Sequence, residues 1–268
     1  MLDGKISVVM PAYNEAHHIV NNLIETVETL YRCGFDFEVI LVDDGSPDKT
    51  YLEAAKLLTA HPTTVRVVHY AQNQGKGNAL ICGVMHARGH YVAFLDADMD
   101  LHPSQLTTFV GIMEATDADA VIGSKFHPAS DVVYPPVRRI YSGIYYMLTR
   151  MFFGLPIRDT QTGLKLFRAE LLHQVLPRLT VKRYAFDVEL LANAHRMGFR
   201  LVDAPVTLSF QRITNRVKLK DAFSVLWDTL AVFYRMHILR YYDDHRGGRK
   251  SIIHQIEGRE ITPVRSEQ

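Results

Sequence analysis

Residues 91–98 read Tyr-Val-Ala-Phe-Leu-Asp-Ala-Asp, an apolar run that ends at two carboxylates. Such a continuous run is typical of a strand that is buried on both faces of a sheet. Two aspartates that are two positions apart at the end of a strand can converge on one hard cation. A polar loop that caps the next helix is the alternative interpretation, because aspartate is common there. The surrounding sequence decides between the two.

Similar apolar runs lie on both sides of this stretch, and segments with helical spacing separate them. The predicted strands cover residues 6–10, 37–42, 65–70, 91–95 and 120–124. The predicted helices cover residues 18–30, 50–58 and 79–87, and one more begins after Pro103. Strands that alternate with helices form a parallel sheet with helices on both faces. The sequence therefore predicts an α/β fold with a mostly parallel sheet flanked by helices.

A polar cluster follows each predicted strand. The clusters cover residues 11–15, 43–48, 73–78, 96–100 and 123–125. In sheets of this class ligands bind beyond the carboxyl ends of the strands, so all of the clusters belong to one edge and describe a site. In that setting we prefer the metal interpretation of Asp96 and Asp98 to the capping one.

Two of the clusters can hold a nucleoside. Residues 11–15 place the Tyr13 ring and the Glu15 carboxylate at this edge, where a base could stack, although they could also simply connect a strand to a helix. Asp43 and Asp44 either form a turn that caps a helix or accept hydrogen bonds from a nucleobase or a ribose.

The Gly-rich turn around Lys76 can bind phosphate. Its backbone amides and the lysine ammonium are both suitable donors to an anion. The spacing of Gly75-Lys76-Gly77 does not match the phosphate loop of nucleoside triphosphatases. The mismatch removes an obvious kinase or ATPase interpretation.

Composition excludes several other classes. The formal net charge is +1, so no overall field points to a nucleic acid partner. Cys33 and Cys82 lie in apolar segments, which favours a reducing, cytosolic compartment over a disulfide framework. We expect no signal peptide, because residues 1–5 lead directly into a strand. No window of about 18–20 residues is free of charge, so we expect no membrane-spanning helix.

The second half of the chain has a different pattern. We expect the catalytic domain to cover residues 1–220, with a basic and aromatic helix over about residues 134–157. An amphipathic helix is predicted over residues 221–243, followed by a charged tail over residues 244–268 that we expect to be disordered. Both helices could lie in a membrane interface, or they could pack in the core or form a dimer interface.

Four motifs together resemble family 2 glycosyltransferases of the GT-A fold. They are Pro11-Ala12-Tyr13-Asn14-Glu15, Val42-Asp43-Asp44-Gly45-Ser46, Gly75-Lys76-Gly77-Asn78-Ala79 and Asp96-Ala97-Asp98. The resemblance implies an inverting transferase that uses a nucleotide-diphosphate sugar and holds the diphosphate through Mg²⁺ or Mn²⁺. It implies that the donor is bound by Pro11, Tyr13, Glu15, Val42, Asp43, Asp44, Lys76, Asp96, Ala97 and Asp98.

Downstream motifs resemble the polyprenyl-phosphate sugar synthases of this family, which include dolichyl-phosphate glucosyl- and mannosyltransferases. The motifs are Gly123-Ser124-Lys125, Arg138-Arg139 with Ser142, and residues 158–167, while residues 183–191 look nearer the glucosyl branch. The resemblance implies UDP-glucose as donor, with GDP-mannose next. It implies an acceptor-phosphate site of Lys125, Arg138, Arg139 and Ser142, a mobile loop with Arg212 and Lys218 over the diphosphate, and Asp100 as a third metal ligand beside Asp96 and Asp98. Relatives typically have Arg at position 125 and often Gln or Glu at position 100.

The acceptor would determine the mechanism. A lipid monophosphate is largely dianionic at neutral pH, because its second pKa is near ~6, so it needs cations rather than a general base. We therefore expect Asp96, Asp98, Lys125 and Arg138 to be the catalytic residues.

We expect an enzyme that is peripheral at the cytoplasmic face of a membrane. A membrane-protein partner and a homodimer are the two forms of assembly left open. A transferase with a soluble phosphorylated or sugar acceptor is the alternative, and a nucleotide-binding module without activity is a third. A processive polysaccharide synthase is disfavoured, because the Gln-x-x-Arg-Trp signature is missing and the only tryptophan is Trp227.

Overall fold

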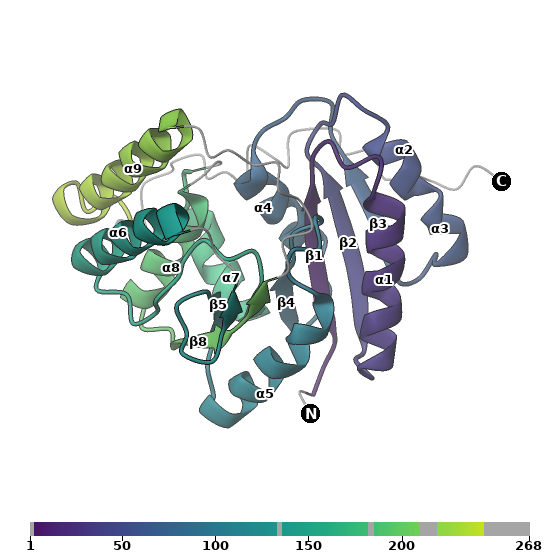
Figure 1. Ribbon diagram of the computed structural model, residues 1–268, viewed down its shortest axis with the longest axis horizontal. Coiled ribbons are helices and arrows are strands. Elements are labelled where there is room, and N and C mark those ends of the chain that lie inside the picture. The colour runs from purple at the N-terminus through teal and green to yellow at the C-terminus, as the bar shows by residue number, and fades with distance from the viewer. Residues whose placement is uncertain (1–2, 133–135, 182–184, 209–218, 244–268) are drawn as a thin grey trace.

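A seven-stranded sheet forms the centre of the protein. The computed structural model describes residues 3–132, 136–181, 185–208 and 219–243, and within them the strand order is β3-β2-β1-β4-β7-β5-β8 (Figure 1). The strands are β1 (Ile6–Ala12), β2 (Phe37–Asp43), β3 (Val65–His69), β4 (Tyr91–Phe94), β5 (Ala120–Ser124), β7 (Lys165–Arg168) and β8 (Leu201–Pro205). All neighbours pair in parallel except β7, which is antiparallel to β4 and β5. The predicted mostly parallel sheet is confirmed.

The later strands differ from the sequence prediction. β7 was not predicted as a strand, because a run of four residues that begins with Lys165 and ends with Arg168 has no apolar signal of useful length. The sequence also predicts a strand over residues 202–211, of which residues 209–211 lie outside the described residues. Within the described part, β8 ends at Pro205, which has no N–H to donate. A second, two-stranded parallel sheet follows, made of β6 (Asp131–Val132) and β9 (Thr207–Leu208).

Helices cover both faces of the sheet. One face packs against α1 (Ile19–Arg32), α2 (Thr50–Ala55), α3 (Leu57–Ala60) and α5 (Leu106–Thr116), and the other against α4 (Lys76–His86), α7 (Ala169–Val175) and α8 (Phe186–Arg196). Val8 and Met10 of β1 point into the first core, whereas Val9 points into the second. This alternation explains the continuous apolar run, since both sides of the strand are buried.

Two further helices form a separate layer beside α8. α6 (Pro136–Phe153) and α9 (Leu219–Phe233) lie side by side at one end of the molecule (Figure 1). The Tyr145 hydroxyl lies 3.1 Å from that of Thr229, and the Phe152 and Phe233 rings are 4.9 Å apart. α9 continues into a π-helical turn, η3 (Tyr234–Ile238), and the short helices η1 (Pro103–Gln105) and η2 (Leu176–Arg178) complete the set. In the described segments, no helix combines enough length and hydropathy to cross a bilayer.

Candidate functional site

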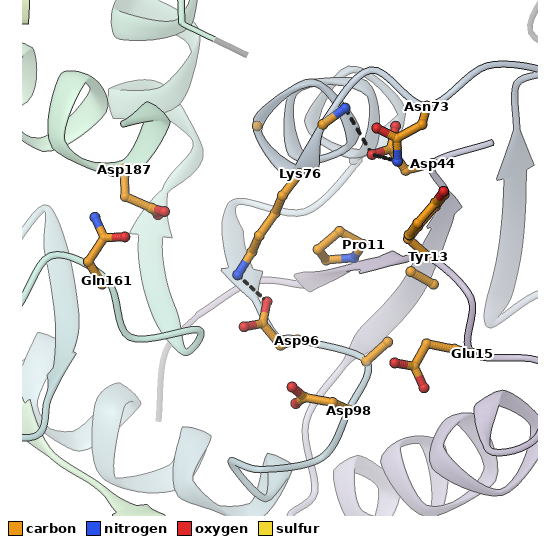
Figure 2. Close-up of a pocket in the computed structure, with 14 residues that line it drawn as sticks. Pro11, Tyr13, Glu15, Asp44, Asn73, Lys76, Asp96, Asp98, Gln161 and Asp187 are labelled. Carbon is orange, nitrogen blue, oxygen red and sulfur yellow. Dashed lines mark hydrogen bonds and ion pairs between the residues drawn. The ribbon is translucent and has the colours of Figure 1, made fainter. Parts of the chain in front are cut away.

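A cavity of about 550 Å³ lies beyond the carboxyl ends of the central strands. Four of the five predicted polar clusters contribute to it, and the cluster at residues 123–125 does not. The lining residues are Pro11, Ala12, Tyr13, Glu15, Asp44, Asn73, Gly75, Lys76, Gly77, Asp96, Ala97, Asp98, Gln161 and Asp187. Figure 2 shows Lys76 and Asp96 in the middle, with Asp44 on one side and Asp187 on the other. The expectation that distant clusters meet at one sheet edge is therefore met for these residues.

An ion pair between Lys76 and Asp96 occupies the middle of the cavity, with Lys76 Nζ 2.5 Å from Asp96 Oδ1. Burial disfavours the charged form of each group. The neighbouring carboxylates, chiefly Asp96 and then Asp187, nevertheless raise the pKa of Lys76, and the Lys76 ammonium lowers the pKa of Asp96. Lys76 is also the first residue of α4, three residues earlier than predicted, and Gly75 with φ 97° precedes it. A helix N-terminus and an ammonium group thus point at the same space, which suits a phosphate.

Asp98 follows Asp96 on the turn that leaves β4. Burial, then the nearby carboxylates of Asp96 and Asp100, raises the pKa of Asp98 to about 6. The next residue, Met99, has a left-handed backbone with φ 61°, and the Asp100 N–H donates to Asp98 Oδ1 at 3.1 Å. The turn therefore holds the Asp98 carboxylate at the cavity wall.

Asp44 organises the other side of the cavity. Its Oδ1 accepts from the Tyr70 hydroxyl at 2.6 Å and the Gln74 N–H at 2.8 Å, and its Oδ2 accepts from Asn73 at 3.0 Å and the Gly75 N–H at 2.9 Å. Burial raises the pKa of Asp44, although these donors act in the opposite direction. Asp44 thus fixes the turn that leads into Lys76.

Two residues expected at the nucleotide lie beneath the cavity instead. The Asp43 carboxylate is fully buried, 2.8 Å from His69 Nδ1, and it also accepts from the Ser46 hydroxyl. Val42 packs in the core against α4. The reason is strand alternation, which turns Val42 inward, and the demand of a buried carboxylate for its own donors. The other predicted donor residues of this side, Pro11, Tyr13, Glu15 and Ala97, line the cavity.

Gln161 and Asp187 form the far wall, and the sequence interpretation did not assign them to the site. Asp187 Oδ1 lies 2.6 Å from Lys165 Nζ, and Lys165 also donates to the Thr162 carbonyl at 2.6 Å. Lys165 is only 2% exposed. One signal in the sequence pointed here: a lysine inside the apolar run Leu-Lys-Leu-Phe requires a carboxylate partner if that run is buried.

Lys125 lies outside the lining of the cavity. Its Nζ is 2.7 Å from Asp159 Oδ2 and 3.2 Å from the Thr162 hydroxyl, and its side chain is 16% exposed. Lys125 is therefore held by the loop of residues 159–163 that precedes β7.

The remaining predicted residues are placed only in part. Ser142 is half-buried on α6, and Asp100 lies on the turn after Asp98. The side chains of Arg138 and Arg139, on the first turn of α6, and all of Arg212 and Lys218 lie outside the described residues.

Asp96 and Asp98 are the residues that could hold a divalent cation. Among the residues that the structure describes, no three His, Cys, Asp or Glu side chains are grouped to bind a metal by themselves. Asp96 and Asp98 both border the cavity. Burial, and after it the neighbouring carboxylates, raise the pKa of Asp98, and a bound cation would offset both effects. The pair fits Mg²⁺ or Mn²⁺ if a diphosphate supplies further oxygen ligands.

Sequence comparison identifies the family. Residues 7–176 match the family described as Glycosyl transferase family 2. The chain belongs to this family. The match covers β1 to α7, so it includes every described lining residue of the cavity except Asp187. The resemblance noted in the motifs is confirmed.

Curated relatives share about a third of their aligned residues with this chain. Glycosyltransferase AglD of Haloferax volcanii is 34% identical over 204 residues, 75% of this chain and 32% of the relative. Dolichyl-phosphate beta-glucosyltransferase of Dictyostelium discoideum is 32% identical over 217 residues, 75% of this chain and 65% of the relative. The chain thus spans about a third to just under two thirds of the length of these relatives.

Solved structures confirm the fold. Glucosyl-3-phosphoglycerate synthase of Mycobacterium tuberculosis in complex with UDP is 23% identical, with a TM-score of 0.64 over 91% of this chain and 82% of that one. The same enzyme with Mn²⁺, UDP-glucose and phosphoglyceric acid is 24% identical, with a TM-score of 0.64 over 85% and 79%. At this level of identity the likeness shows the GT-A fold alone.

Proposed function

We propose that this protein is a metal-dependent hexosyltransferase that transfers glucose from UDP-glucose to a polyprenyl (dolichyl-type) phosphate with inversion. The observation that carries the proposal is the cavity, in which the Lys76–Asp96 pair and Asp98 lie between the side lined by Pro11, Tyr13 and Asp44 and the side lined by Gln161 and Asp187. The names of the dolichyl-phosphate beta-glucosyltransferases support glucose and the lipid acceptor. Complexes of the structural neighbours with UDP-glucose and Mn²⁺ support the donor and the metal. GDP-mannose is the second donor.

The cavity suggests how the donor would lie in it. The nucleoside would contact Pro11, Tyr13 and the turn held by Asp44, and the diphosphate would meet Lys76 and the N-terminus of α4. The sugar would then extend toward Gln161 and Asp187, which lie on the side of Lys76 that is opposite Asp44 (Figure 2). A Mg²⁺ or Mn²⁺ ion held by Asp98 and Asp96 would neutralise charge on the leaving diphosphate.

The acceptor chemistry needs no proton transfer. A phosphate oxygen of the lipid attacks the anomeric carbon from the face opposite UDP, so a new C–O bond forms as the bond to the β-phosphate breaks. An α-linked donor then gives a β-linked product. Lys125, Arg138, Arg139 and Ser142 are the proposed contacts of the acceptor phosphate. Because Lys125 is paired with Asp159, the incoming phosphate would have to share that ammonium group.

Replacing Lys125 with alanine tests this assignment. We expect kcat to fall at least about tenfold, the size of a lost charge-assisted contact, while the affinity for UDP–Mn²⁺ changes by less than about threefold. Initial rates against acceptor concentration and calorimetric titration with UDP–Mn²⁺ measure the two effects. Equal losses in both would assign Lys125 to the framework of the donor site instead.

An exposed apolar surface on α6 and α9 suits a lipid bilayer. Ile144, Met147 and Met151 on α6, and Trp227, Leu230, Tyr234 and Ile238 on α9 and η3, are all at least 38% exposed. They recur at helical spacing on two helices that lie side by side (Figure 1). Tyr145 connects this layer to the cavity, since its hydroxyl lies 3.1 Å from Thr229 and 3.5 Å from the Gln161 amide nitrogen. We propose that this surface binds peripherally to the cytoplasmic face of a membrane.

Charged substitutions on this surface should weaken membrane binding. The double variant Met147→Glu/Met151→Glu should lower co-sedimentation with phosphatidylcholine–phosphatidylglycerol vesicles at least about tenfold, since each buried methionine contributes roughly 1.5–3 kcal/mol. Leu52→Glu is the matched control, because Leu52 is 59% exposed on α2, at the opposite end of the molecule (Figure 1). Equal binding by both variants contradicts the proposal. A change from dimer to monomer without loss of vesicle binding would identify a subunit interface.

A soluble phosphorylated acceptor is the second candidate, because the structural neighbours are named as synthases of glucosyl-3-phosphoglycerate. The deciding experiment offers UDP-[¹⁴C]glucose and Mn²⁺ with either a short polyprenyl phosphate or 3-phosphoglycerate. We expect labelled glucose to enter the organic phase with the prenyl phosphate, and no transfer to 3-phosphoglycerate. A labelled aqueous product that forms only with 3-phosphoglycerate, and that is separated from UDP-glucose, would favour the second candidate.

A further inference from the structure

Gly163 lies directly behind the carboxylate of Asp96. A β-carbon at Gly163 would lie 2.2 Å from Asp96 Oδ2 and 2.6 Å from Asp96 Cγ, far inside van der Waals contact. The backbone of Gly163 does not have a positive φ, so an alanine could adopt it. The obstacle to a side chain at this position is therefore Asp96 itself.

The loop that carries Gly163 has little freedom to move away. Asp159 Oδ2 is 2.7 Å from Lys125 Nζ and accepts from the Thr162 hydroxyl at 2.6 Å, while Asp159 Oδ1 accepts from the Gln161 N–H at 2.9 Å. The buried Lys165 ammonium donates to the Thr162 carbonyl at 2.6 Å. Because the buried Lys165 holds Thr162, and Asp159 holds the Gln161 N–H and the Thr162 hydroxyl, the loop is fixed directly before Gly163. The group that must yield to a side chain at position 163 is therefore the Asp96 carboxylate.

We propose that Gly163 is a positioning residue for the donor site. The loop of residues 159–163 packs against the Asp96 carboxylate and directs it toward Lys76 and the cavity. Only glycine at position 163 leaves room for that carboxylate. A methyl group at position 163 would turn the carboxylate away from its place beside Lys76. This inference rests on the proposed UDP–metal site and concerns no acceptor.

A double-mutant cycle tests the link between the two residues. Gly163→Ala should lower the affinity for UDP–Mn²⁺ at least about tenfold, the size typical of a lost group that orients a ligand residue. In the Asp96→Ala background, where the carboxylate is absent, Gly163→Ala should lower it by less than about twofold, because interacting residues are not additive. Isothermal titration calorimetry with UDP in the presence of Mn²⁺ measures all four proteins.

Thermal unfolding without ligand keeps the test independent of binding. Gly163→Ala should lower the Tm of the parent by about 5 °C, as overpacking of a site does. In the Asp96→Ala background the loss should be at most half as large, because the nearest remaining atom of residue 96 is Cβ, 3.2 Å from the added methyl group. Gly111→Ala is the matched control, because Gly111 is exposed on α5 and a methyl group added there would have no heavy atom within 4 Å.

Two outcomes overturn the inference. One is unchanged UDP–Mn²⁺ affinity in Gly163→Ala, and the other is an equal effect of Gly163→Ala with and without the Asp96 carboxylate. If the parent protein does not bind UDP–Mn²⁺, the proposed donor fails, and the cycle in Tm still decides the role of Gly163.

Discussion

Replacing Asp98 with asparagine should lower the rate of sugar transfer about 10²–10³-fold, since a metal contributes several kcal/mol to a transition state and about 1.4 kcal/mol corresponds to a tenfold change in rate. Asparagine keeps the shape of the side chain and its acceptor for the Asp100 N–H, but it has no charge for the metal. Burial and adjacent carboxylates already disfavour the ionised form of Asp98, as its pKa of about 6 records. The metal-free variant should therefore unfold at the same Tm as the parent or above it. Steady-state rates and thermal scans measure the two effects.

Asp100→Asn is the matched control on the same turn. Asp100 was predicted as a third metal ligand, but its side chain does not line the cavity. If Asp98 binds the ion and Asp100 does not, the rate of sugar transfer by Asp100→Asn should stay within about fivefold of the parent rate. That change is far smaller than the loss expected for a metal ligand. A large loss in both variants would assign both carboxylates to the metal. Full activity of Asp98→Asn would contradict the proposed metal site.

Replacing Lys165 with methionine should lower Tm by about 10 °C. Removing one partner of a buried ion pair leaves an uncompensated charge, which costs roughly 3–5 kcal/mol, and roughly 2–4 °C of Tm accompanies each kcal/mol in a chain of this size. In this variant the Asp187 carboxylate would lose its ion-pair partner, and the Thr162 carbonyl would lose a hydrogen-bond donor. The loop behind Asp96 would lose its contact with the Lys165 ammonium. Differential scanning calorimetry without ligand measures the change.

Two companion variants identify the cause of that loss. Lys56→Met removes an exposed partner of Glu53, with 64% of the lysine side chain in solvent, and should shift Tm by less than about 3 °C. Lys165→Met/Asp187→Leu removes both buried charges and should recover at least half of the loss, as apolar replacements of buried pairs do. If the double variant recovers none of the lost Tm, the lost contact with Thr162, and not the unpaired Asp187 carboxylate, causes the destabilisation.

The fold could be predicted because its signals are local. Strands that are buried on both faces are continuous apolar runs, and the polar clusters after them have to lie at one edge once the strands are parallel. β7 escaped prediction because Lys165 and Arg168 leave only two apolar residues between them, so its pairing with β4 and β5, rather than its own pattern, makes it a strand. α4 begins at Lys76 instead of Ala79, because Asp44 accepts the N–H groups of the preceding turn.

The same difference between local and long-range signals separates the residues of the candidate site. Asp96, Asp98, Lys76 and Asp44 could be found from strand ends, since each follows its strand within a few residues or opens the next helix. Asp187 and Gln161 could not, because they reach the cavity from segments that lie 60 or more residues further along the chain. Only the packing of α8 and of the loop before β7 brings them to the same space.

By itself, the sequence determined the α/β class, the edge of the sheet that holds the cavity and the carboxylates proposed to hold a metal, because short-range periodicity and residue chemistry specify these. The tertiary structure decided the rest. It turned Val42 and Asp43 away from the cavity, since alternation and the hydrogen-bonding needs of a buried carboxylate act only in the packed state. It also placed Gly163 against Asp96 and paired Lys125 and Lys165 with carboxylates, since buried charges have to find partners that the folded chain alone can bring near.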